Sequence, residues 1–119
     1  MRTAIFPKDR HALYEQHGYS AAIQSKDLLF VSGQVGSLED GSPVPDFEKQ
    51  VIQAFKNLAE TLKAAGCTFD DIIDVTTFHT DPERQFESIM KVKNQIFTQK
   101  PYPKYLALYS CTVSTKIFG

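Results

Sequence analysis

The stretch FVSGQVG (residues 30–36) places a serine and a glycine inside a run that otherwise has the composition of a β-strand. A glycine within a strand marks either a bulge or a point where a ligand or another backbone comes close. The sequence therefore predicts a bulge or a ligand-contacting corner at Ser32 and Gly33, and both readings stay open. Ser32 is not expected to be a hydrolase nucleophile, because no G-x-S-x-G elbow is present.

The histidines do not have the spacing of a metal site. His11, His17 and His79 are scattered along the chain, and His79 stands within a predicted strand beside Thr80 and Asp81. A structural or surface role is expected for His79, and neither a metal site nor a cofactor is expected.

Two further groups of charged residues permit chemistry but also have ordinary explanations. Lys104 and Tyr105 follow Pro103 at the start of a late strand, where a lysine binds an anion or protects a strand edge. Asp70, Asp71 and Asp74 precede a strand in a polar turn, and we expect solvated capping residues there.

The elements that position these residues follow from the spacing of apolar side chains and from turn residues. Expected strands lie within residues 3–7, 21–24, 28–36, 69–80 and 101–110, with a hairpin turn at 25–27, a loop at 37–46 and a loop or short turn between Pro7 and Gly18. Expected helices begin after Asp46 and end at Gly66, and begin after Asp81 and end before Pro101.

This order predicts a two-layer α+β domain in which both helices cover one face of a mixed sheet. The other face would carry Leu28, Phe30, Val35 and Phe78, which are more apolar than a solvated face tolerates. We therefore expect copies of the chain to associate through this face.

Composition narrows the class of protein. The 119 residues fit one domain, and the 13 basic and 14 acidic residues give a net charge of −1, so neither a nucleic acid nor a membrane partner is expected. Cys67 and Cys111 lie far apart and no signal-peptide core or membrane-spanning run is present, which favours thiols in the cytoplasm.

Several stretches together resemble the RidA (YjgF) family of reactive-intermediate deaminases, and in particular its YjgH-like branch. The matching stretches are GYSAAI (18–23), DLLFVSGQVG (27–36), AFKNLAETLKAAGCTFDDIIDVTTFHTD (54–81) and VKNQIF (92–97). The resemblance implies a chorismate-mutase-like fold and a homotrimer around a β-barrel core, with clefts between subunits that take a small-molecule ligand.

The resemblance also implies an atypical site. Tyr19 matches the cleft tyrosine of the family, and Ser32 and Gly33 match its cleft backbone. The arginine of the P-x-R-[ST] motif, which grips a carboxylate, falls on Tyr105, whose side chain cannot replace that charge. The family's asparagine on the second helix falls on Met90, and its late glutamate has no counterpart. Tyr19, Ser32, Gly33 and Tyr105 are thus the expected binding residues, and no catalytic residue is assigned.

The expected function is hydrolytic deamination of imines, enamines or related small metabolites, and the alternative is a non-catalytic ligand-binding or regulatory homotrimer. A ribonuclease activity is disfavoured by the neutral charge. A single domain over residues 1–119 is expected, and the similarity fades from about residue 106, so the end of the chain is expected to be divergent or truncated.

Overall fold

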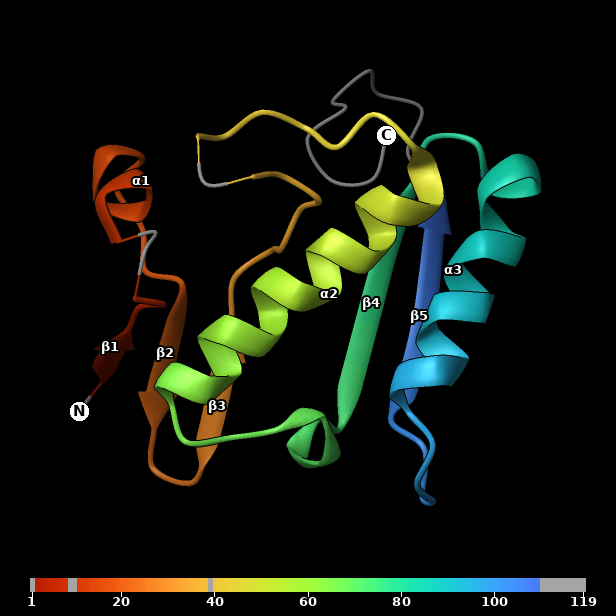
Figure 1. The fold of residues 1–119 in the computed structure, drawn as a ribbon. Coiled ribbons are helices and arrows are strands. Elements are labelled where there is room, and N and C mark those ends of the chain that lie inside the picture. The colour runs from red at the N-terminus through yellow and green to blue at the C-terminus, as the bar shows by residue number, and fades with distance from the viewer. Residues whose placement is uncertain (1, 9–10, 39, 110–119) are drawn as a thin grey trace.

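The computed structural model describes residues 2–8, 11–38 and 40–109. Figure 1 shows a three-stranded antiparallel sheet on one side and a parallel strand pair on the other, with helices packed alongside. Strands β1 (Thr3–Ile5), β2 (Ala22–Ser25) and β3 (Leu28–Val31) form the first sheet, and β4 (Asp74–His79) pairs with β5 (Lys104–Tyr109). The chain has an α+β fold, as predicted.

The two long helices are where the sequence predicted them. Helix α2 (Phe47–Ala64) begins at Asp46, whose carboxylate accepts a hydrogen bond from the Lys49 N–H at 3.0 Å. Helix α3 (Pro82–Ile96) has Pro82 in its first turn and ends several residues before Pro101. Asp81 does not cap this helix with its side chain, and its N–H donates instead to Gln85 Oε1 at 3.1 Å.

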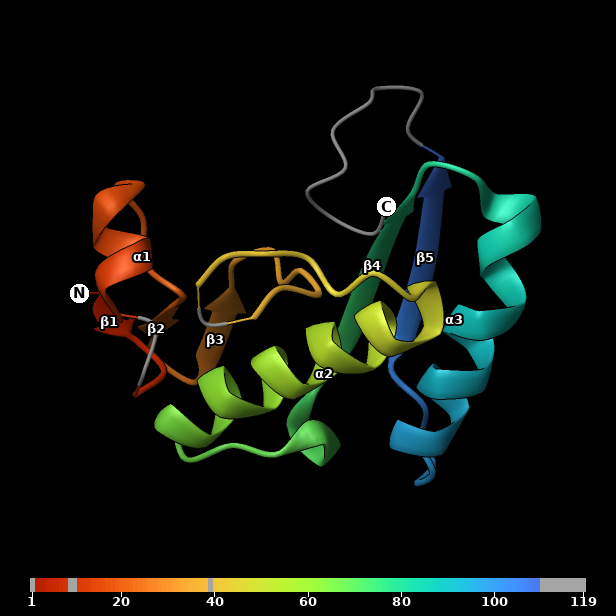
Figure 2. The same cartoon turned by 45° about the horizontal axis from the view of Figure 1, so that its top comes forward.

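The core lies between α2, α3 and the start of β4 (Figure 2). Its buried members are apolar residues of the two helices together with the residue that follows α3: Val51, Ala54, Phe55, Ile89, Val92 and Phe97. Phe69, from the short 3₁₀ helix η1 (Phe69–Asp71), stacks edge-on against Phe55 and Phe97. These contacts fix α3, and with it β4 and β5, against α2.

Three details differ from the sequence prediction. Helix α1 (His11–Gln16) forms where a loop or short turn was expected, since its six residues carry no apolar stripe and Tyr14 is its buried anchor. The strand expected within 28–36 ends at Val31, and the one expected within 69–80 begins only at Asp74, after η1.

The predicted single mixed sheet is also wrong for the described residues, because β3 and β4 belong to separate sheets. Helix α2 connects these strands, and no described strand joins them by hydrogen bonds. The late strand β5 pairs with β4 in parallel, and these two strands form a two-stranded sheet in which β4 lies at an edge.

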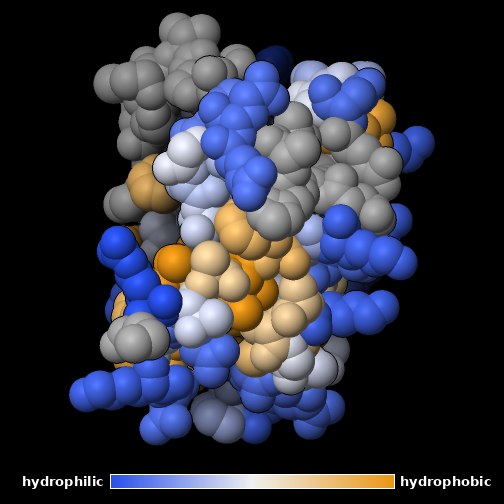
Figure 3. Space-filling model, turned by 90° about the vertical axis from the view of Figure 1, so that its left-hand side faces the viewer, coloured by the Kyte–Doolittle hydropathy of each residue, from blue (hydrophilic) through white to orange (hydrophobic). Residues whose placement is uncertain are grey.

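Side chains on β4 alternate between the two faces of the strand pair. Val75, Thr77 and His79 turn inward, and Thr76 and Phe78 turn outward. Phe78 is 38% exposed, and Leu28 and Phe30 on β3 are 51% and 59% exposed, as predicted for an uncovered apolar face, whereas Val35 is partly buried. Figure 3, which views the molecule from the side of α1 and β1, shows apolar atoms gathered between hydrophilic ones. Among the described residues, no helix is long and apolar enough to cross a membrane.

Candidate functional site

The first group of predicted site residues lies where β2 begins and β3 ends. The Ser32 hydroxyl donates to the Ser20 carbonyl at 2.6 Å, and the Ser32 N–H donates to the Ala21 carbonyl at 2.9 Å. These two bonds hold Ser32 beside the residue that follows Tyr19. We call Tyr19, Ser20, Ser32 and Gly33 the β2–β3 corner.

Tyr19 gives this corner an exposed phenol. The residue is 48% exposed, and its ring meets the Tyr14 ring edge-on, with centroids 5.3 Å apart. Partial burial raises the pKa of the Tyr19 phenol, and the neighbouring Tyr14 raises it further. The phenol therefore stays protonated at neutral pH and can donate a hydrogen bond to a ligand.

Gly33 is exposed and faces open space. A Cβ built at Gly33 would meet no atom within 4 Å, and the residue does not have a positive φ. Gly36 is different, because a Cβ there would collide with the backbone carbonyl of Gln50 on α2. The packing of α2 therefore requires a glycine at position 36, whereas the space next to Gly33 is open to a ligand or to another chain.

The second group lies on the inward face of the β4–β5 pair. The Tyr105 hydroxyl and the Thr77 hydroxyl are 2.7 Å apart, and Thr77 Oγ1 is 2.7 Å from His79 Nε2. The Lys93 ammonium of α3 lies 4.7 Å from the centroid of the Tyr105 ring. We call Tyr105, Thr77 and His79 the hydroxyl chain.

Neither Thr77 nor Lys93 was predicted as part of a site. The sequence did indicate that Thr77 and His79 are two polar residues on the same face of a strand. Their connection to Tyr105, however, depends on how β4 and β5 pair. Lys104 lies on the opposite face of β5 from Tyr105, as the alternation of side chains along a strand requires, and its ammonium lies 3.6 Å from the Asp74 carboxylate. Asp71 caps η1 by accepting from the Thr68 N–H at 2.9 Å, as expected.

The structure does not bring the two groups together within one chain. In both Figure 1 and Figure 2, β2 and β3 lie on one side of the molecule and β4 and β5 on the other. Tyr19, Ser32 and Gly33 therefore form one exposed corner, and Tyr105 belongs to a different region.

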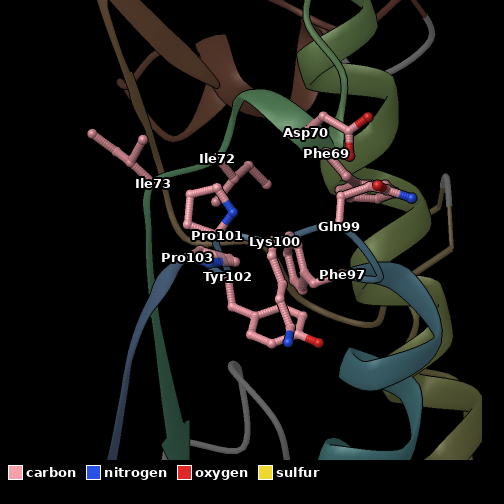
Figure 4. A pocket seen from close by; sticks show the side chains of 10 residues that line it. All are labelled: Phe69, Asp70, Ile72, Ile73, Phe97, Gln99, Lys100, Pro101, Tyr102 and Pro103. Atoms are coloured by element: carbon pink, nitrogen blue, oxygen red, sulfur yellow. The ribbon is translucent and has the colours of Figure 1, made fainter.

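A hollow of about 490 Å³ lies elsewhere, between η1, the start of β4 and the segment that joins α3 to β5. Figure 4 shows Phe69, Ile72 and Phe97 on its apolar wall with Pro101 and Tyr102 from the connecting segment. Its volume is that of a small-ligand pocket, but none of the four predicted binding residues lines it. In the parts of the chain that the structure describes, no cluster of three His, Cys, Asp or Glu side chains is placed to hold a metal ion.

Comparison with known proteins gives one consistent family. A profile of the family described as Endoribonuclease L-PSP matches residues 9–114. The RutC family protein YjgH of Escherichia coli K12 is 70% identical over 107 residues, which is 90% of this chain and 82% of that protein. The mouse 2-iminobutanoate/2-iminopropanoate deaminase is 42% identical over 65 residues, 53% of this chain and 48% of the mouse protein.

The fold agrees with the sequence match. The solved structure of protein YjgH superposes with a TM-score of 0.91 at 65% sequence identity, covering 98% of this chain and 89% of that one. The likeness to YjgH thus extends over most of both chains, whereas the match to the mouse deaminase covers about half of each.

Proposed function

The chain belongs to the Endoribonuclease L-PSP (RidA/YjgF) family, and on this premise we propose that it hydrolyses small imines or enamines in a cleft between subunits. The observation that carries the proposal is that the predicted contact residues form two separate groups, each partly exposed, on two sides of one chain. A cleft between neighbouring copies would bring the β2–β3 corner of one copy to the hydroxyl chain of the next. The similarity of part of this chain to the mouse 2-iminobutanoate/2-iminopropanoate deaminase supports the reaction class.

The proposed assembly is a homotrimer. Leu28, Phe30 and Phe78 supply an exposed apolar face that an association of copies would bury. Light scattering at micromolar concentration should report a trimer, and Phe30→Glu, which places a charge on this face, should dissociate it. A stable wild-type monomer would contradict the proposal.

The chemistry requires little from the protein beyond position and hydrogen bonds. Water adds to the electrophilic carbon of the C=N bond, the nitrogen gains protons and leaves as ammonia, and a carbonyl compound remains. The corner offers the Tyr19 phenol and the exposed backbone around Gly33 to orient the substrate and the water.

Tyr105 makes the site atypical in its treatment of anions. A phenol provides one neutral hydrogen-bonding group, whereas an arginine would provide a fixed, bidentate positive charge. Lys93 brings an ammonium near the ring, but on a flexible stem and as a single point charge. The proposal therefore favours uncharged imines over 2-imino acids.

The direct test compares two imines of similar size, one with a carboxylate and one without. Each would be generated in place, and its disappearance would be followed with and without the purified protein. We expect the uncharged imine to be hydrolysed faster than its spontaneous rate, and the 2-imino acid to be accelerated less.

A non-catalytic ligand-binding trimer is the second candidate, and the tyrosine at position 105 favours it. Acceleration of neither imine, together with measurable binding of the carbonyl product, would support this candidate against the enzyme. Ribonuclease activity is not favoured, because a net charge of −1 offers little to a phosphate backbone.

A further inference from the structure

Two polar residues occupy inward positions of β4 where a strand packed under helices normally carries apolar side chains. Thr77 is 3% exposed and His79 is 1% exposed, while their neighbour Val75 packs against the apolar core. Burying a hydroxyl and an imidazole is unfavourable unless they are hydrogen-bonded. Their bond to each other at 2.7 Å meets that requirement in part.

This buried pair is connected to the partly exposed Tyr105. In the parallel register Tyr105 stands opposite Val75, so its side chain shares the inward face and reaches Thr77 on the diagonal. The hydroxyl chain therefore runs from a fully buried imidazole, through one hydroxyl, to a phenol that is only partly buried.

The direction of the two bonds is restricted, because each hydroxyl has one proton to donate. If His79 Nε2 carries no proton, Thr77 donates to it and Tyr105 donates to Thr77, which leaves the phenol oxygen as an acceptor for a ligand. If Nε2 carries a proton, it donates to Thr77, Thr77 donates to Tyr105, and the Tyr105 O–H is released toward a ligand.

We propose that His79 is a positioning residue that acts through Thr77 to set whether Tyr105 offers a ligand a hydrogen-bond acceptor or a donor. When the Tyr105 oxygen is left as an acceptor, which we call the acceptor state, the hydroxyl chain suits a ligand N–H, such as that of an imine. When the Tyr105 O–H is released toward the ligand, which we call the donor state, the hydroxyl chain suits a ligand oxygen, such as that of the carbonyl product. The ligand classes rest on the proposed function, whereas the coupling between His79 and Tyr105 does not.

Around the hydroxyl chain, charged side chains of the described residues lie on α2, α3 and β5. Lys93 of α3 is the cation over the Tyr105 ring, Lys104 of β5 is paired with Asp74 on the other face, and Glu48 of α2 is paired with Lys91 at 3.3 Å. Burial lowers the pKa of His79, so the imidazole is neutral at pH 7 and takes its second proton only in acid. When the neutral ring carries its proton on Nδ1, acidification adds the second proton at Nε2 and so drives the hydroxyl chain into the donor state.

The experiment follows both ends of the chain by NMR on the intact protein without ligand, with ¹⁵N in the histidine rings and ¹³C at tyrosine Cζ. His79→Gln and Tyr105→Phe assign the two signals. Between about pH 8 and about pH 4 we expect the His79 ring and the Tyr105 Cζ to shift with one shared midpoint. Thr77→Ser, which keeps the hydroxyl, should preserve this shared midpoint. Thr77→Val should remove the Tyr105 response while His79 still titrates.

Three results would overturn the proposal: separate midpoints in the wild type, a His79 ring that keeps one protonation state until the fold is lost, or a Tyr105 response that survives in Thr77→Val. If Thr77→Val does not fold, the wild type and Thr77→Ser decide the question. Near-ultraviolet circular dichroism on the same samples marks the pH at which the fold is lost. Because the measurement needs no turnover, its outcome is independent of the imine assay.

Discussion

The β2–β3 corner and the hydroxyl chain of the β4–β5 pair both carry predicted site residues, but they present their polar groups in opposite ways. At the corner, Ser32 is held by bonds to the backbone, and the exposed groups are a phenol and a glycine. In the hydroxyl chain, the three side chains bond to one another, and Thr77 and His79 are buried. The corner should therefore tolerate substitution with little loss of stability, whereas changes to the hydroxyl chain should affect the whole domain.

The two glycines near the corner give the largest expected contrast. Gly36→Ala drives a Cβ into the Gln50 backbone, so α2 must shift, and we expect a loss of about 3 kcal/mol in the free energy of unfolding. Gly33→Ala is the matched control and should change it by less than about 0.5 kcal/mol. Urea unfolding at equal protein concentration measures both, and equal losses would show that the corner is as constrained as the helix contact.

Thr77→Val is the corresponding change in the hydroxyl chain. It keeps the side-chain volume but removes the partner of His79 Nε2, and a buried polar group that loses its partner costs about 1–3 kcal/mol. Thr76→Val on the outward face of the same strand is the control and should stay within about 0.5 kcal/mol of wild type. If Thr77→Val were as stable as Thr76→Val, the hydroxyl chain would contribute nothing to the fold.

His79 should make stability depend on pH. Its folded pKa lies below its unfolded value of 6.5, so the unfolded state binds more protons in the interval between them. The stability that the neutral His79 contributes is fully present at pH values above its unfolded pKa. It is lost as the pH falls from the unfolded pKa toward the folded pKa. His79→Gln should flatten this slope by at most about 1.4 kcal/mol per pH unit. An unchanged slope in His79→Gln would assign the pH dependence to other groups.

Local patterns were sufficient for much of the fold. Asp46 and Gly66 delimit α2 as predicted, the hairpin turn lies between Ser25 and Leu28, and the outward face of β4 follows from alternation. Helix α1 was missed because six residues around one buried tyrosine carry no periodic signal. The separation into two sheets depends on which distant strands pair, and neighbouring residues do not encode that.

The candidate site was predictable only in part, for the same reason. Tyr19, Ser32 and Gly33 come together through the short β2–β3 hairpin, so their grouping follows from local sequence. Thr77 joins Tyr105, which is 28 residues away in the sequence, only through the parallel pairing of β4 and β5. The demand for glycine at position 36 arises from the way α2 packs. The predicted divergence after about residue 106 stays a prediction, because residues 110–119 lie outside the described ones.

The central claim is that Tyr105 occupies the position that determines how the site treats a carboxylate. The most direct measurement is calorimetric titration of 2-oxobutanoate, the carbonyl product of 2-iminobutanoate, into wild type and Tyr105→Arg. Lys104→Arg serves as a control, since it places a guanidinium one residue away on the opposite face. A charge-assisted contact should tighten binding to Tyr105→Arg on the order of tenfold, with Lys104→Arg unchanged. Unchanged affinity in a Tyr105→Arg protein that keeps the wild-type oligomeric state, or efficient hydrolysis of 2-imino acids by wild type, would contradict the account.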